Sequence, residues 1–142
     1  MIKKHGWTLI LCLFLSADTQ AIESITMEVL SVKSVYDGDT FRVDLKDSGN
    51  DFFTKNISVR ILGIDAPEIR GKCALEKSKA IKSRDYLRKI LSGEKIVLKN
   101  VGHDKYFRLL ADVYADGKSV KDLMLKNNFA VRYDGSKKIS WC

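Results

Sequence analysis

Short runs in which apolar and polar residues alternate recur along the chain and constrain its fold more than any other feature. In the clearest run, Phe41, Val43 and Leu45 alternate with charged residues. Successive side chains of a strand point to opposite faces of a sheet, so this run predicts a half-buried strand. We expect four further strands, over residues 27–36, 57–64, 95–101 and 108–115.

Two segments show helical spacing instead. The first covers residues 73–91 and is followed by Gly93, a plausible C-terminal stop. Its apolar stripe would consist of Ala80, Ile81, Leu87, Ile90 and Leu91. The second covers residues 119–127, where Ser119 would cap the helix.

The predicted order is therefore three strands, a helix, two strands and a helix. Several short strands in a small chain favour a closed barrel, because closure removes exposed sheet edges. We predict an α+β, mainly β, domain: a five-stranded OB-fold barrel with two to three helices. OB folds often bind nucleic acids, but a fold alone does not establish an activity.

The N-terminal residues have the order of a secretory signal. Lys3 and Lys4 precede an apolar run over residues 7–15, and small residues precede a cleavage point after Ala21. The run is far shorter than the roughly 20 residues that span a membrane. We predict a signal peptide over residues 1–21 and one mature domain over residues 22–142, secreted or periplasmic, without a stable membrane anchor after cleavage. Cleavage after Ala17 and a buried N-terminal element are the alternatives.

Removal of residues 1–21 leaves 23 Lys and Arg (25 − 2) against 17 Asp and Glu (18 − 1), a net charge of +6. A basic balance favours polyanionic partners, although this signal is weak by itself. Cys73 and Cys142 remain as an even pair in an exported protein, so a disulfide between them is the favoured interpretation. Two free thiols are the alternative.

Carboxylates and arginines lie beside the predicted strands in four short stretches: residues 37–40, Arg60, residues 65–68 and Arg108. Taken singly, these stretches are more typical of a hairpin turn, a solvated loop or surface ion pairs. Together they favour cleavage of a phosphodiester, in which a cation and fixed positive charges offset the phosphate charge and a base activates water. Two carboxylates about 4 Å apart repel by roughly 4 kcal/mol at an effective dielectric of 20, which a shared proton or a divalent cation would relieve. Oxygen ligands suit Ca²⁺ best, with Mg²⁺ or Mn²⁺ as alternatives.

Three blocks, residues 35–40, residues 60–68 and residues 104–108 leading to 114–117, resemble the staphylococcal nuclease (thermonuclease) family. The resemblance runs from about Leu30 to Val131 and implies an OB-fold enzyme that hydrolyses DNA and RNA with Ca²⁺, leaving 3′-phosphate ends. The resemblance also implies a role for each of the following residues. Asp39, Asp65 and the Ala66 backbone carbonyl would be calcium ligands; Glu68 would orient or deprotonate water; Arg60 and Arg108 would bind the scissile phosphate; Lys105 and Tyr106 would contact a terminal phosphate; Tyr133 would lie near the stacking tyrosines.

The chain also departs from the family pattern. Ala66 replaces a threonine, and Phe107 stands where glycine usually precedes the arginine. The loop after Glu68 is short and reaches Cys73, and the third helix of the type member has no counterpart before Cys142.

The resulting hypothesis is a monomeric, secreted or periplasmic, calcium-dependent nuclease with DNA and RNA as substrates. The alternative is a non-catalytic OB-fold module that binds single strands or other anions. We place it second because such degenerate members normally lose the acidic and arginine positions that are present here.

Overall fold

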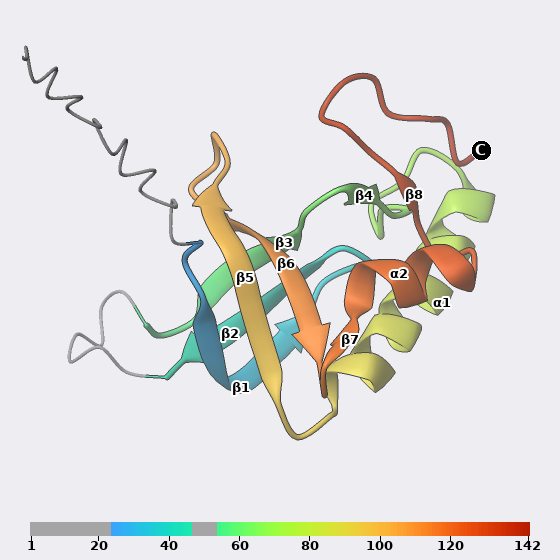
Figure 1. Cartoon of the computed structure of the whole chain (residues 1–142). Helices are drawn as coiled ribbons and strands as arrows, with labels where there is room; N and C mark the ends of the chain where they lie inside the picture. The colour runs from blue at the N-terminus through green and yellow to red at the C-terminus, as the bar shows by residue number, and fades with distance from the viewer. Residues whose placement is uncertain (1–23, 47–53) are drawn as a thin grey trace, which may run out of the picture.

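The computed structural model describes residues 24–46 and 54–142, so the predicted signal peptide and part of the loop after β2 lie outside the described residues. The strands of the barrel in Figure 1 are β1 (Met27–Val35), β2 (Thr40–Leu45), β3 (Ile57–Ile61), β5 (Ile96–His103) and β6 (Leu109–Ala115). They pair in the order β3-β2-β1-β5-β6, and a parallel pairing of β3 with β6 closes the sheet. The predicted five-stranded barrel and the mainly β class are confirmed.

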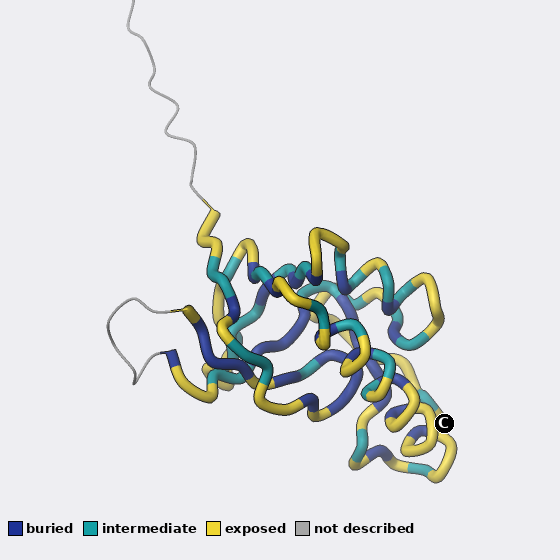
Figure 2. The backbone as a smooth tube through the Cα atoms, turned by 90° about the horizontal axis from the view of Figure 1, so that it is seen from below, coloured by how far each residue is buried: buried dark blue, intermediate teal, exposed yellow. Residues whose placement is uncertain are grey.

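The hydrophobic core fills the interior of the barrel. In Figure 2 the buried residues appear as dark blue stretches of the backbone tube. Phe41 and Val43 of β2 are fully buried, whereas Arg42 between them is exposed. Asp44 breaks the predicted alternation because it is also buried. Its carboxylate accepts a hydrogen bond of 2.8 Å from the backbone N–H of Asn56, which satisfies a polar group in that position.

The third predicted strand is interrupted, contrary to the expectation that it continues to Ile64. Gly63 has a φ of +82°, which a regular strand does not accommodate. After this residue the chain leaves the barrel, and β4 (Ile64–Asp65) pairs with β8 (Val131–Arg132). This short pair, which the residue pattern does not predict, brings the 65–68 stretch next to the C-terminal segment of the chain.

Both predicted helices are present, as α1 (Ala74–Leu91) and α2 (Val120–Lys126), and they lie together beside the barrel (Figure 1). Ser119 ends the short strand β7 (Lys118–Ser119) and caps α2, accepting a hydrogen bond of 3.2 Å from the N–H of Asp122. The predicted stripe of α1 is wrong at Ile81, which is 47% exposed. In the described part of the chain, neither helix is both long and apolar enough to cross a membrane.

Candidate active site

A cleft of about 1110 Å³ opens where the β1–β2 turn, the end of β3 and the β5–β6 turn meet the C-terminal segment. Seven of the residues predicted to act in a site line it: Asp39, Arg60, Glu68, Lys105, Tyr106, Arg108 and Tyr133. Asp65 and Ala66 are buried beside it, 2% and 1% exposed. The four stretches that are separate in sequence are therefore adjacent in space.

Arg60 lies at the centre of the acidic part of the cleft and is itself buried. One guanidinium nitrogen is 2.6 Å from Asp39 Oδ1, and another is 3.6 Å from Asp65 Oδ1. Burial disfavours its charge, but the two carboxylates outweigh burial and hold the pKa of Arg60 above its ordinary value. The predicted meeting of Asp39 with Asp65 thus occurs across one guanidinium, which keeps its charge.

The turn that carries Asp39 is fixed by hydrogen bonds on both carboxylate oxygens. Oδ1 accepts from the Thr40 hydroxyl at 2.8 Å, and Oδ2 accepts from the backbone N–H of Ala66 at 2.9 Å. The second bond ties the turn between β1 and β2 directly to the end of β4. Asp39 is consequently held in one orientation.

Asp37 adds a third buried carboxylate, and its Oδ1 accepts a hydrogen bond of 3.1 Å from the Asp39 N–H. Burial, with the charge of Asp39 next in importance, raises the pKa of Asp37 to about 7. The sequence marked this residue only as part of a turn. Burial and the neighbouring carboxylate of Asp39 therefore both favour the neutral form of Asp37.

Gly38 allows the turn to approach the rest of the site closely. A Cβ at this position would lie 2.8 Å from the Cβ of Ala66 and would overlap the side chain of Ser83 on α1. Its φ is not in the left-handed region, so packing against α1 and the 65–68 stretch requires the glycine.

Lys138 and Trp141, which the sequence did not indicate, complete the acidic site from the C-terminal segment. The ammonium of Lys138 is 2.9 Å from both Asp65 Oδ1 and Glu68 Oε1, and the Trp141 indole N–H donates to Asp65 Oδ2 at 3.2 Å. Partial burial disfavours the ammonium charge, but Glu68 and Asp65 hold the pKa of Lys138 above its usual range.

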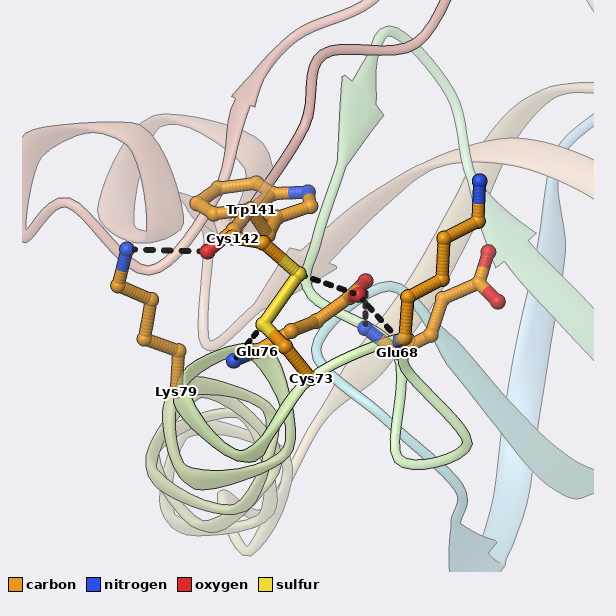
Figure 3. The surroundings of a disulfide bond; sticks show 7 residues. Glu68, Cys73, Glu76, Lys79, Trp141 and Cys142 are labelled. Atoms are coloured by element: carbon orange, nitrogen blue, oxygen red, sulfur yellow. Dashed lines mark hydrogen bonds between the residues drawn. A yellow bond between two sulfur atoms is a disulfide. The ribbon is translucent and has the colours of Figure 1, made fainter.

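A disulfide joins Cys73 to Cys142, with 6.0 Å between the two Cα atoms, as predicted (Figure 3). The predicted pairing of the two cysteines is also the feature of the sequence from which the position of Lys138 could have been inferred. Lys138 lies four residues before Cys142, and Glu68 lies five residues before Cys73, so the bridge brings the two side chains into reach of each other.

Arg108 is in the cleft but is bound by a neighbour. The Nε–H of Arg108 donates to Asp104 Oδ2 at 2.8 Å, and Nη2 of Arg108 lies 2.7 Å from the same oxygen. Tyr106 lies between the cations of Lys105 and Arg108, at 5.1 and 5.5 Å from its ring centroid. No ion pair joins Arg108 to the Asp39–Asp65 cluster in the described part of the chain. Arg60 and Arg108 therefore line the same cleft with different carboxylate partners.

Two aromatic residues border the arginines. Phe107, at the tip of the β5–β6 turn, is 90% exposed and has a φ of 61°, the left-handed conformation in which glycine is usual. Tyr133 lies over Arg60, with 5.8 Å between the guanidinium carbon and the ring centroid. The tyrosine predicted to stack on a base is therefore also in cation–π contact with the central arginine.

A divalent cation fits the charge of this cluster. Asp39, Asp65 and Glu68 supply three negative charges when ionised, and Arg60 and Lys138 supply two positive charges. Asp37, with a pKa of about 7, adds up to one more negative charge, so the balance lies between −1 (2 − 3) and −2 (2 − 4). Asp65 Oδ1 is buried, and no donor among the described residues is aligned with it for a hydrogen bond, although two cationic groups contact it. An oxygen atom of this kind suits a hard cation.

Protein ligands alone do not complete such a site. Within residues 24–46 and 54–142, Cys73, Glu76 and Cys142 form the one group of three potential ligand residues close enough to share an ion, and its two sulfurs are bonded to each other. A cation at Asp39 and Asp65 would therefore add the Ala66 carbonyl and water molecules to the two carboxylates, as hard cations commonly do.

The fold and the cleft define a small OB-type barrel with an acidic, arginine-containing site at the ends of its strands. Residues 58–140, more than half of the chain, match the staphylococcal nuclease homologue family, and the chain belongs to this family.

Relatives of the chain carry nuclease names. A probable staphylococcal-like nuclease of Oryza sativa subsp. japonica is 32% identical over 85 residues, which cover 60% of this chain and 24% of that protein. An uncharacterized endonuclease of Escherichia coli is 30% identical over 104 residues, which cover 72% of this chain and 60% of that protein. The chain thus spans about a quarter of the length of the plant relative and less than two thirds of the bacterial one.

Proposed function

We propose that this protein is an exported, calcium-dependent nuclease that hydrolyses phosphodiester bonds of DNA and RNA and leaves 3′-phosphate ends. The observation that carries the proposal is the buried guanidinium of Arg60 in contact with Asp39 and Asp65, in a cleft that Glu68 also lines. Membership of the nuclease family and the nuclease names of the relatives support the enzymatic class.

In this proposal Asp39, Asp65 and the Ala66 carbonyl would hold the cation, which would offset the phosphate charge and lower the pKa of a bound water. Arg60, whose orientation is fixed by Asp39, would donate to one phosphate oxygen. Arg108, which lines the same cleft and is oriented by Asp104, would donate to another. Their paired donors match phosphate geometry and stabilise the charge that develops on the phosphorus oxygens.

Glu68 is the base in this scheme. Its side chain is 52% exposed, at a position where water and substrate reach it. It accepts a proton as the water oxygen bonds to phosphorus. The bond from phosphorus to the 5′ oxygen breaks, and this oxygen takes a proton from solvent and leaves as a 5′-hydroxyl, so the phosphate stays on the 3′ side. Lys105 and Tyr106 on the β5–β6 turn would contact a neighbouring phosphate.

Export rests on the signal-like residues 1–21 and on a disulfide that is typical of oxidising compartments. Periplasm and medium are both compatible with these features. The preference for Ca²⁺ over Mg²⁺ rests on the oxygen-only ligand set and on the resemblance described above.

The test is cleavage of end-labelled DNA and RNA by the purified protein with Ca²⁺, with Mg²⁺ and with EGTA, followed by analysis of the new ends. We expect cleavage with Ca²⁺ that EGTA abolishes, and products that a polymerase cannot extend at the 3′ end without prior phosphatase treatment. Undiminished cleavage in EGTA would refute the calcium dependence. Glu68→Ala should abolish cleavage while retaining DNA binding. If wild type binds single strands but cleaves under no condition, the non-catalytic binding module is the correct function.

A further inference from the structure

The C-terminal residues 133–142, named here the strap, cross from β8 to the start of α1 (Figure 1), and Lys138 and Trp141 of the strap contact the acidic site. At one end, the backbone N–H of Tyr133 donates to the Gly63 carbonyl at 3.0 Å. At the other end, Cys142 is bonded to Cys73. The strap is thus fastened at both ends, and Lys138 lies between the two fastenings.

Further contacts between the strap and α1 surround the disulfide at the second fastening (Figure 3). Lys79 Nζ donates to the Trp141 carbonyl at 3.4 Å and lies 5.9 Å from the centroid of its indole ring. Glu76 accepts from the backbone N–H of Glu68 at 3.4 Å and from that of Lys72 at 2.8 Å. The same region of α1 therefore holds the end of the strap and the loop that carries Glu68.

Lys138 occupies a position that a bound cation would also need. Its ammonium is 2.9 Å from Asp65 Oδ1, a buried oxygen of the proposed cation site, and at the same distance from Glu68. Trp141 donates to the other oxygen of Asp65. Both oxygens of this carboxylate are thus engaged by the strap, so an ion that enters must displace at least the ammonium from its contact.

We propose that Lys138 is the internal counter-ion of the cation site, that a divalent cation must displace it, and that the disulfide-anchored strap thereby sets the metal affinity. Lys138 is a positioning residue here: in the absence of metal it holds Asp65 and Glu68 together. The inference rests on the proposed cation site at Asp39 and Asp65, but it does not depend on cleavage of nucleic acid.

The experiment measures Ca²⁺ binding to the metal-free full-length chain by titration calorimetry without DNA. Lys138→Met should bind Ca²⁺ about tenfold more tightly than wild type, a change equivalent to about 1.4 kcal/mol. Lys137→Met is the matched control, because Lys137 is an exposed lysine of the strap that makes no ion pair within the described residues. Loss of its screened charge should change the affinity less than about threefold.

Opening the disulfide provides a second, independent route. Cys142→Ser frees the end of the strap and should also tighten Ca²⁺ binding. In a Lys138→Met background the same substitution should have little further effect, because both changes act through one ammonium. Additive effects of the two substitutions would contradict the proposed coupling.

Trp141 reports on the strap without any change at Lys138. With Trp7→Phe, Trp141 is the single tryptophan. Its emission should change on Ca²⁺ addition with the same midpoint as calorimetric binding. Equal affinities of Lys138→Met and Lys137→Met, no emission change on binding, or no Ca²⁺ binding by any variant would each overturn the inference. Tight binding that responds to Lys138 without cleavage of DNA or RNA would instead refute the nuclease proposal and leave this one standing.

Discussion

Replacement of Arg60 by glutamine tests whether the buried carboxylates depend on its charge. The substitution keeps hydrogen-bonding capacity but removes the positive charge from between Asp39 and Asp65, whose side chains are only 7% and 3% exposed. Removal of one partner from a buried ion pair costs about 3–5 kcal/mol, because the remaining charge has no compensation. Small domains have a total stability of about 5–15 kcal/mol, so the variant should be folded but fragile.

The assay is urea denaturation in EGTA and again in excess Ca²⁺. In EGTA we expect a free energy of unfolding about 3 kcal/mol or more below wild type. Ca²⁺ at 100 times the dissociation constant of the variant should raise the free energy of unfolding of the variant by about 2.7 kcal/mol above its own value in EGTA. Cleavage should remain undetectable in either condition, because the phosphate has lost its central arginine.

Arg42→Gln is the matched control on the neighbouring strand β2. Arg42 lines the same cleft but is exposed and donates to Asn56 at 2.8 and 2.9 Å. Loss of such a surface contact should cost less than about 1 kcal/mol and should not depend on Ca²⁺. If the Arg60 variant loses no more stability than this control, the charge balance drawn for the site is incorrect.

Three further predictions follow from single residues. Gly38→Ala should lower the free energy of unfolding by about 1–3 kcal/mol in urea denaturation, because its Cβ would overlap Ser83; an unchanged midpoint would contradict the packing role. Phe107→Asn should raise stability by about 0.5–1 kcal/mol in the same assay, since asparagine tolerates the left-handed conformation and little buried area is lost; a loss would indicate that Phe107 packs against another segment. Burial disfavours ionisation of Asp112, but Lys121 outweighs it and holds the pKa of Asp112 below its usual range. Its contribution to stability is therefore present above the unfolded-chain pKa of about 4 and is lost as pH falls through the lower folded value. Asp112→Asn should destabilise the protein at pH 7 and much less at pH 2, as measured by denaturation midpoints at both pH values.

The barrel was predictable because its strands carry the signal in neighbouring residues. The alternation around Phe41 and the helical stripe containing Leu87 follow directly from which face is buried. The break at Gly63 was not predictable in this way, since residues 62–64 continue the apolar run and only the backbone conformation at Gly63 ends the strand. The β4 and β8 strands contain two residues each, too few for any periodicity to appear.

The sequence predicted which residues belong to the site better than it predicted the contacts between them. Asp39 and Arg60 are each ordinary when taken singly, and they were recognised because the carboxylates and arginines together suit phosphodiester cleavage; both are now seen in contact. The partner of Arg108 was missed although Asp104 lies only four residues away, because a local ion pair had no reason to be preferred over a free side chain. Placement and chemistry together make the roles of these residues testable, and their catalytic roles remain predictions.

Lys138 illustrates why a disulfide is also information about function. The pairing of Cys73 with Cys142 was read from the sequence as a staple of the fold, which is its usual meaning in a small exported domain. In three dimensions the same bond delivers a lysine to the carboxylates of Asp65 and Glu68, two residues that no local pattern connects with the C-terminal segment. A cross-link that constrains the unfolded chain also restricts which charges can meet in the folded one. In this protein, cutting the bond would therefore change stability, the reach of the strap and the placement of the Lys138 charge together.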